Sequence, residues 1–269
     1  MVQRPLPAWF LAFAANAVCV TGAGATGLPQ SLPEQLRIGV AYVTPALKST
    51  EFRVFTEDGF EQDIGREIAR SLGMKPTFVR IAPGDGPDLL ATGAIDIAVE
   101  RARVEALEAG RRNAIETGYR SAKSVAMRTD TDIVEWSNLA GRIVCVAEAG
   151  VDEQRIAASH GATLRIERAP ALSLMLVRTG ECDAALHDEA LLAALFEEEG
   201  WQKFSATLPP VEPSALVVET VDSNPALRRE VEEAVRALAA DSEWGTRRAR
   251  WARNVSFEVY LEQDAPDCH

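Results

Sequence analysis

Two stretches of the chain, 87 positions apart (179 − 92), are nearly copies of each other and end in side chains of opposite charge. The first is Thr92–Arg101 (TGAIDIAVER) and the second is Thr179–Asp188 (TGECDAALHD). In each copy an aspartate opens a short apolar strand, and two polar residues follow it: Glu100-Arg101 and His187-Asp188. Ligands of open α/β sheets bind beyond the carboxyl ends of the strands. The pattern therefore predicts a receptor of two lobes, with a cation on one wall of its cleft and an anion on the other.

The elements that position these side chains also repeat. In the first half we expect strands at residues 36–41, 77–81 and in the first copy, with helices at 60–72 and 88–92. In the second half we expect strands at residues 142–147, 163–167 and in the second copy, with helices at 152–159 and 172–178. Extended segments at residues 123–128 and 215–219 follow the two halves, and a helix is expected at residues 225–240. This order predicts an α/β fold of two βαβαβ lobes that hinge about two extended segments.

Composition excludes some partners. The formal net charge is −12 and no basic stripe is present, which argues against nucleic acid and against an anionic membrane surface. A hydrophobic content of 47% is enough for two cores in 269 residues.

Residues 1–25 have the pattern of a secretory signal peptide. Arg4 gives the positive start, residues 9–20 (WFLAFAANAVCV) the apolar stretch, and Ala23-Gly24-Ala25 the small-residue cleavage site. A lipoprotein site at Cys19 fits less well, because Asn16 and Val18 are unusual at such a site. We expect a soluble protein exported to the periplasm.

Two cysteines lie in strands that are expected in the second half. Cys145 belongs to one expected strand and Cys182 begins another, so a disulfide between them is geometrically possible if the strands are adjacent. Such a bond would stabilise the fold by about 3–4 kcal/mol. The alternative is a pair of buried free thiols. No spacing suited to metal ligation is present, and no role is visible for Cys268.

The chain resembles the extracellular solute-binding proteins of family 3, the periplasmic receptors of polar amino-acid ABC importers. The resemblance rests on the order and spacing of several segments: LRIGVA, GFEQDIGREIARSLG, TGAIDIAV, GRIVCVAEAG, TGECDAALHDEALLAALF and ALVVETVDSNPALRREVEEAVRALAADSEWG, which together span about residues 34–252. It implies the type II periplasmic-binding-protein fold. Lobe one would then comprise residues 34–124 and 218–255, and lobe two residues 125–217, with a polar tail at residues 256–269.

The resemblance also implies a ligand site. In this family, an aspartate that ends a strand of lobe two holds the ammonium group of the ligand, and Asp188 has that position. The turn at Gly150-Val151 precedes a helix whose N–H groups would receive the carboxylate. An aromatic residue after the first strand stacks on the ligand, which indicates Tyr42, with Phe52 or Phe55 behind it.

Lobe one departs from the family pattern. Small hydroxyl residues are usual after its third strand, whereas this chain has Glu100-Arg101-Ala102-Arg103. The arginine that clamps the ligand carboxylate would fall near Glu108–Arg111. Arg101, Arg103 and Arg111 are therefore alternative clamps, and Glu100 is either a ligand contact or the partner of Arg101. Asp188 also suits a helix N-cap, and His187 suits a structural role.

The sequence predicts a periplasmic receptor that captures a small polar solute, an amino acid or related zwitterion, and delivers it to an ABC permease. No cofactor, metal or enzymatic activity is expected, and the protein is expected to be a monomer. One alternative is a non-transport accessory that docks a partner such as a periplasmic oxidoreductase. Another is a dehydratase-like enzyme with Glu100 or Asp188 as its acid.

Overall fold

The computed structural model describes residues 34–44, 59–110, 114–221, 223–240 and 243–262. The pattern of contacts divides the chain after residue 31, and every described element belongs to the unit of residues 32–269. The predicted signal peptide lies outside the described residues.

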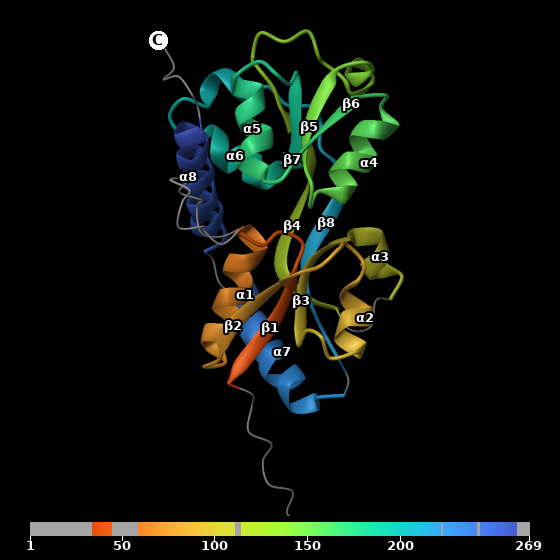
Figure 1. The fold of residues 1–269 in the computed structure, drawn as a ribbon, viewed down its shortest axis with the longest axis vertical. Coiled ribbons are helices and arrows are strands. Elements are labelled where there is room, and N and C mark those ends of the chain that lie inside the picture. Colours follow the sequence, from red (N-terminus) through yellow and green to blue (C-terminus); the bar gives the residue numbers. More distant parts are fainter. Residues whose placement is uncertain (1–33, 45–58, 111–113, 222, 241–242, 263–269) are drawn as a thin grey trace, which may run out of the picture. The chain divides into compact units, whose positions relative to one another are not determined.

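Strands in the described part of the chain form one mixed sheet of eight, in the order β2-β1-β3-β8-β4-β7-β5-β6 (Figure 1). Their bounds are β1 Gln35–Val40, β2 Lys75–Arg80, β3 Ile97–Arg103, β4 Ala114–Ala126, β5 Ile143–Ala147, β6 Thr163–Glu167, β7 Ala184–Asp188 and β8 Val211–Thr220. Strands β1–β3 pair in parallel, and so do β5–β7. Between these sets β4 and β8 pair antiparallel with each other, and each also pairs antiparallel with one outer strand, β8 with β3 and β4 with β7. The predicted fold of two βαβαβ units joined by two extended segments is confirmed.

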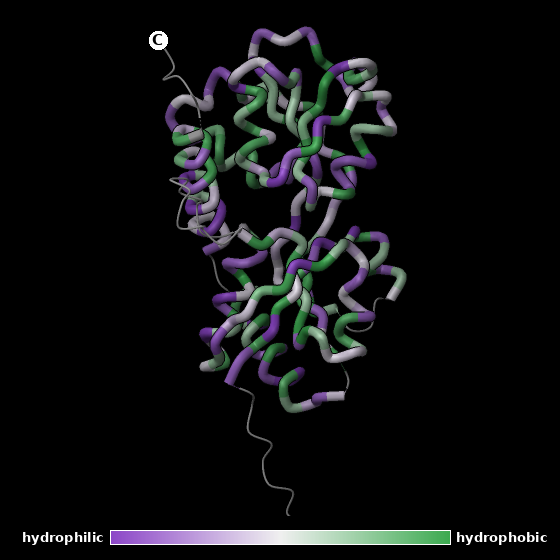
Figure 2. Tube along the Cα trace, viewed as in Figure 1, coloured by the Kyte–Doolittle hydropathy of each residue, from purple (hydrophilic) through white to green (hydrophobic). Residues whose placement is uncertain are grey.

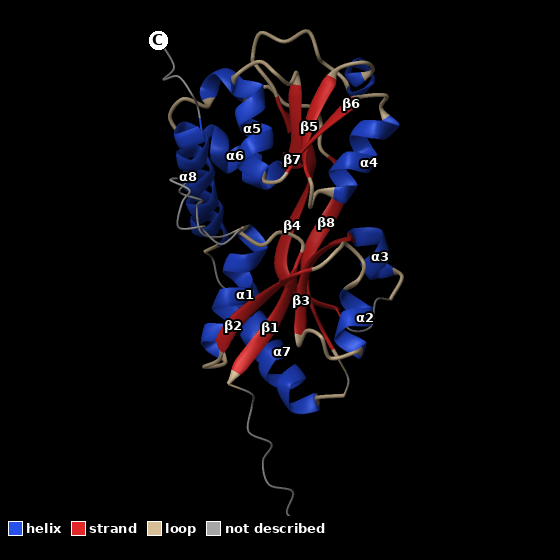
Figure 3. Cartoon of the chain, viewed as in Figure 1, coloured by secondary structure: helices blue, strands red, loops and turns tan. Residues whose placement is uncertain are grey.

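Helices cover both sides of the sheet in each half (Figure 3). Their bounds are α1 Phe60–Ser71, α2 Gly86–Ala91, α3 Val104–Glu108, α4 Val151–Ser159, α5 Pro170–Arg178, α6 Glu189–Phe196, α7 Pro225–Ala240 and α8 Trp244–Glu262, with short 3₁₀ turns at Trp136–Leu139 and Gln202–Phe204. We call β1–β3 with α1, α2, α3 and α7 lobe one, and β5–β7 with α4, α5 and α6 lobe two; the exact boundaries suggested by the sequence stay a prediction.

Hydrophobic residues concentrate along the strands of both lobes (Figure 2). They form three buried clusters, of which the largest extends from lobe one through α5, α6 and α8. The other two lie on the second faces of the lobes, around Val146 in lobe two and Ile95 in lobe one. Among the described residues, no helix combines the length and apolar character that crossing a membrane requires.

The repeated aspartates have the same structural task in both lobes. The carboxylate of Asp96 accepts a hydrogen bond from the backbone N–H of Arg37 at 2.7 Å, and that of Asp183 accepts one from the N–H of Ile143 at 2.8 Å. Each aspartate N–H donates back to the carbonyl of the same residue. The aspartates therefore join the third strand of each lobe to the first, at the end of the sheet away from the charged pairs that close the copies.

Cys145 and Cys182 form the predicted disulfide, with 5.9 Å between their Cα atoms. Strands β5 and β7 are neighbours, with Cys145 opposite Ala185, and Cys182 lies two residues before β7 begins, so the two cysteines are close enough to bond. Both cysteines are buried.

The end of the chain differs from the expectation. We expected a polar tail from residue 256, but Ser256 to Glu262 continue helix α8. This helix packs mainly on α5 and α6 of lobe two and also contacts α1 of lobe one. Val255 and Val259 are buried there, whereas Phe257 and Tyr260 are exposed. Apolar residues therefore lie on both the buried and the exposed face of the helix, and the sequence does not show the spacing that is typical of a helix with one apolar face.

Gly118 gives a test of how β4 packs on α7. Its φ is +84°, and a Cβ built there would lie 3.2 Å from the Cα of Ala239. Gly118→Ala is expected to lower the free energy of unfolding by about 1–3 kcal/mol, because alanine is strained in this conformation and also collides with α7. Urea denaturation measures the loss. Gly93→Ala is the control, since Gly93 has φ +69° but open space around it; equal losses in the two variants would refute the role of the α7 contact.

Candidate functional site

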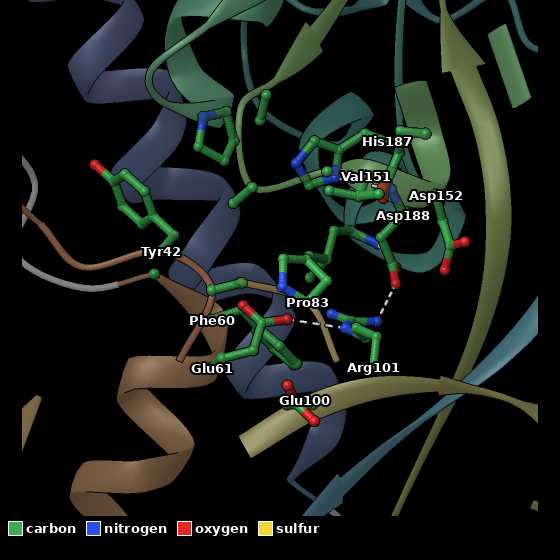
Figure 4. A pocket seen from close by; sticks show the side chains of 18 of the residues that line it. Tyr42, Phe60, Glu61, Pro83, Glu100, Arg101, Val151, Asp152, His187 and Asp188 are labelled. Atoms are coloured by element: carbon green, nitrogen blue, oxygen red, sulfur yellow. Dashed lines mark hydrogen bonds and ion pairs between the residues drawn. The ribbon is translucent and has the colours of Figure 1, made fainter. Parts of the chain in front are cut away.

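A cavity of about 230 Å³ lies where β3 and β7 end, so it is at the position that the repeat predicts (Figure 4). Its lining comes from both lobes, from the hinge strand β4 and from α8. The side chains used below are Tyr42, Phe60, Glu61, Glu100 and Arg101 of lobe one, Lys123 of β4, Gly150, Val151, Asp152, Glu153, His187 and Asp188 of lobe two, and Trp251 of α8.

Most of the predicted site residues line this cavity. They are Tyr42, Glu100, Arg101, Gly150, Val151 and Asp188. Arg103 is not among the lining residues and is exposed. The other predicted candidates, Phe52, Phe55 and Arg111, lie outside the described residues.

The two charges predicted for opposite walls form an ion pair with each other. The Nη1 of Arg101 donates to Oδ2 of Asp188, and these residues occupy equivalent positions in the two copies, 87 residues apart. The exposed fraction is 16% for the Arg101 side chain and 3% for that of Asp188, so the pair is largely shielded from water. This ion pair therefore links lobe one directly to lobe two.

Asp188 also has a structural task at the start of α6. Its Oδ1 accepts hydrogen bonds from the hydroxyls of Tyr119 and Ser121 at 2.9 and 2.8 Å, and from the N–H of Leu191 at 3.1 Å. The last of these is a helix N-cap. Burial alone would raise the pKa of Asp188, but Arg101, Lys123 and the Ser121 hydroxyl outweigh it and lower the pKa to about 2. The carboxylate is therefore charged at all physiological pH values.

Arg101 is held from several sides. Its Nε donates to Glu61 Oε1 at 2.8 Å, and its guanidinium carbon lies 4.9 Å from the ring centre of Tyr119 and 5.5 Å from that of Phe60. Both rings are within the range of cation–π attraction. Burial alone would lower the pKa of Arg101, but the carboxylates of Asp188 and Glu61 keep it well above its ordinary value.

A second ion pair lies at the lobe-two side of the cavity. Lys123 Nζ of the hinge strand donates to Glu153 Oε1 in the first turn of α4 at 2.5 Å, and both side chains are nearly buried. Burial alone would raise the pKa of Glu153, but Lys123 lowers it. Gly150, at the start of this helix, donates its N–H to the carbonyl of Ala147 at 2.9 Å. A Cβ at Gly150 would come within 3.0 Å of Glu153 Oε2, so the glutamate lies directly against this turn.

Aromatic rings of His187, Trp251 and Tyr42 also line the cavity. The rings of His187 and Trp251 lie 5.2 Å apart, and Nδ1 of His187 accepts the N–H of Asp188 at 2.8 Å, which agrees with a structural role. Burial lowers the pKa of His187 despite the nearby carboxylates, so the imidazole is neutral at pH 7. Burial and the carboxylate of Glu258, partly offset by Arg168, raise the pKa of Tyr42 to about 12. The Tyr42 phenol therefore keeps its proton.

Sequence reasoning missed several of these residues. Lys123 opens the extended segment expected at residues 123–128, and Glu153 stands three residues after the helix-opening Gly150; both were visible signals. Glu61 and Phe60 begin a helix that follows a segment outside the described residues. Trp251 was missed because its helix has no clear period.

The described residues contain no group of three or more histidine, cysteine, aspartate or glutamate side chains that could hold a metal ion.

Two parallel βαβαβ lobes, two antiparallel strands between them and a polar cavity at the strand ends define the class of two-lobed binding proteins. Within this class, the family model of the bacterial extracellular solute-binding proteins, family 3, matches residues 36–254, and the chain belongs to this family. No curated protein sequence matches the chain.

Solved structures of amino-acid-binding proteins share the fold. A mutant of ArgBP from T. maritima has a TM-score of 0.55 at 16% identity, over 85% of this chain and 94% of that one. A substrate-binding protein of an amino acid ABC transporter has a TM-score of 0.54 at 17% identity, over 84% and 98%. The ancestral amino-acid-binding protein AncCDT-1, a precursor of cyclohexadienyl dehydratase, has a TM-score of 0.57 at 18% identity, over 81% and 95%.

Proposed function

We propose that the protein captures a small polar solute in the cavity between its lobes and delivers it to the permease of an ABC importer. The observation that supports this best is that one cavity takes its lining from both lobes and from β4. A solute that touches both lobes binds their closed arrangement more tightly than the open one, and this difference drives closure. The family membership supports a role outside the cytoplasm, which we assign to the periplasm, and a binding function without catalysis. We also propose that the protein is a monomer.

The size of the cavity limits the solute. At about 230 Å³ it is smaller than the roughly 300–1,000 Å³ of sites for drug-sized ligands. Carboxylates, a lysine and an arginine line it together with Tyr42, Phe60 and Trp251, so a small charged molecule with an apolar part suits it.

Calorimetric titration of the folded protein with a panel of amino acids, amines and related small solutes tests the proposal. At least one member is expected to bind, and Tyr42→Ala is expected to weaken that binding about tenfold, because it removes an aromatic wall. Tyr260→Ala is the matched control, since Tyr260 is an exposed tyrosine of α8 outside the cavity, and it should leave binding unchanged. A folded protein that binds no member would contradict the proposal.

The second candidate is a non-transport accessory of the same fold that docks a partner. The Arg101–Asp188 pair favours it, because an ion pair between protein side chains joins the lobes at the cavity. Co-purification with a periplasmic partner, together with failure to bind any solute, would replace the first proposal by this one. Turnover of a prephenate-type substrate would instead identify a dehydratase.

A further inference from the structure

A protein side chain already occupies the position expected for the ligand ammonium group. Asp188 is the carboxylate that the family pattern assigns to that group, and its Oδ2 accepts from Arg101. Its Oδ1 accepts from Tyr119, Ser121 and the N–H of Leu191. An ammonium group would have to displace a guanidinium that Glu61 and two aromatic rings also hold.

A protein carboxylate lies against the position expected for the ligand carboxylate. Gly150 uses its N–H on Ala147, and the carboxylate of Glu153 lies against the same turn. Lys123, one of the two cationic lining residues, is paired with Glu153. A ligand carboxylate would meet a buried anion there, and like charges at close range in a site with little water are costly.

The lining of the cavity contains more carboxylates than cationic side chains. It contains five carboxylates, of Glu61, Glu100, Asp152, Glu153 and Asp188, and two cationic side chains, of Arg101 and Lys123, a formal balance of −3. Both cations are already in ion pairs with lining carboxylates, and the lining carboxylate of Asp152 pairs with Arg155, which lies outside the lining. Tyr42, Phe60 and Trp251 add aromatic surface, which attracts cations through its ring faces.

We propose that the cavity selects small organic cations without a carboxylate, such as amines, guanidines or quaternary ammonium compounds. Arg101, paired with Asp188, and Glu153, which lies against the Gly150 turn, would then reject α-amino acids at the two head-group positions. This inference rests on the proposed function and replaces its expected ligand, a zwitterion, by a cation.

Calorimetry with matched pairs tests the inference: agmatine against arginine, putrescine against ornithine, and choline against glycine betaine. The members of a pair differ in a carboxylate. At least one cation is expected to bind ten times more tightly than its carboxylate partner, with an affinity that falls as salt rises. Equal or tighter binding of the amino acids would overturn the ligand class and leave the proposed function standing. No binding by any member to folded protein would overturn both.

Two variants separate charge from packing. Glu61→Gln keeps the shape of the wall and removes one negative charge, so it is expected to weaken cation binding several-fold. Glu116→Gln removes the same charge from an exposed residue of β4 outside the cavity and should have no effect. Arg101→Gln frees Asp188 and is expected to shift the preference within each pair toward the amino acid by tenfold or more. An unchanged ratio in folded Arg101→Gln, or equal effects of the two glutamate variants, would contradict the proposed selection.

Discussion

Replacing Asp188 by alanine is expected to lower the free energy of unfolding by about 3–5 kcal/mol, because the substitution leaves the guanidinium of Arg101 shielded from water without its main partner. It also removes the N-cap of α6 and two hydroxyl contacts. Urea denaturation at pH 7 measures the loss. Asp188→Asn is the control for the cap, since asparagine caps helices as well as aspartate does. If Asp188→Ala lost less than about 1 kcal/mol, the pair would not hold the lobes together.

The pH dependence of stability gives an independent check on the same carboxylate. The pKa of Asp188 is about 2 in the folded state, below the ordinary value of about 3.9. The native state therefore binds fewer protons at this site than the unfolded chain. The stabilisation is complete above about pH 4 and is lost as the pH falls toward 2. Asp188→Asn should flatten this part of the stability curve, and a curve as steep as that of the wild type would count against the assignment.

Removing the disulfide is expected to have an effect of similar size. Cys145 and Cys182 are 37 positions apart, and closing a loop of this length stabilises a fold by about 4 kcal/mol in the chain-entropy model. Dithiothreitol should therefore shift the urea midpoint of the wild type downward. The double variant Cys145→Ala and Cys182→Ala should start at the lower midpoint and not respond to the reductant. A response of this variant to dithiothreitol would show that the reductant acts elsewhere.

The fold was predictable because the two halves of the sequence repeat the same order of strands and helices, with the same residue types at equivalent positions. Asp96 and Asp183 have the same bonds in the two lobes, so the same residue recurs at the same place for the same physical reason. The disulfide followed from the adjacency of two strands, which the order of elements already implied. In both cases local pattern and long-range pairing agree.

The site was less predictable, because its chemistry depends on which charges meet. Arg101 and Asp188 were both identified, but a sequence does not show that equivalent strand ends face each other closely enough to pair. The partner of Glu153 lies 30 residues away on the hinge strand. Trp251 lies on α8, whose pattern is mixed because the helix contacts both lobes.

Helix α8 has a consequence for how the chain is made. The chain reaches this helix from α7 in lobe one, yet α8 covers α5 and α6 of lobe two. Synthesis is vectorial, so the apolar faces of α5 and α6 stay uncovered until residues 244–262 have followed. Lobe two therefore cannot complete its core during its own translation, and its final folding must wait for a segment that follows α7, the last helix of lobe one.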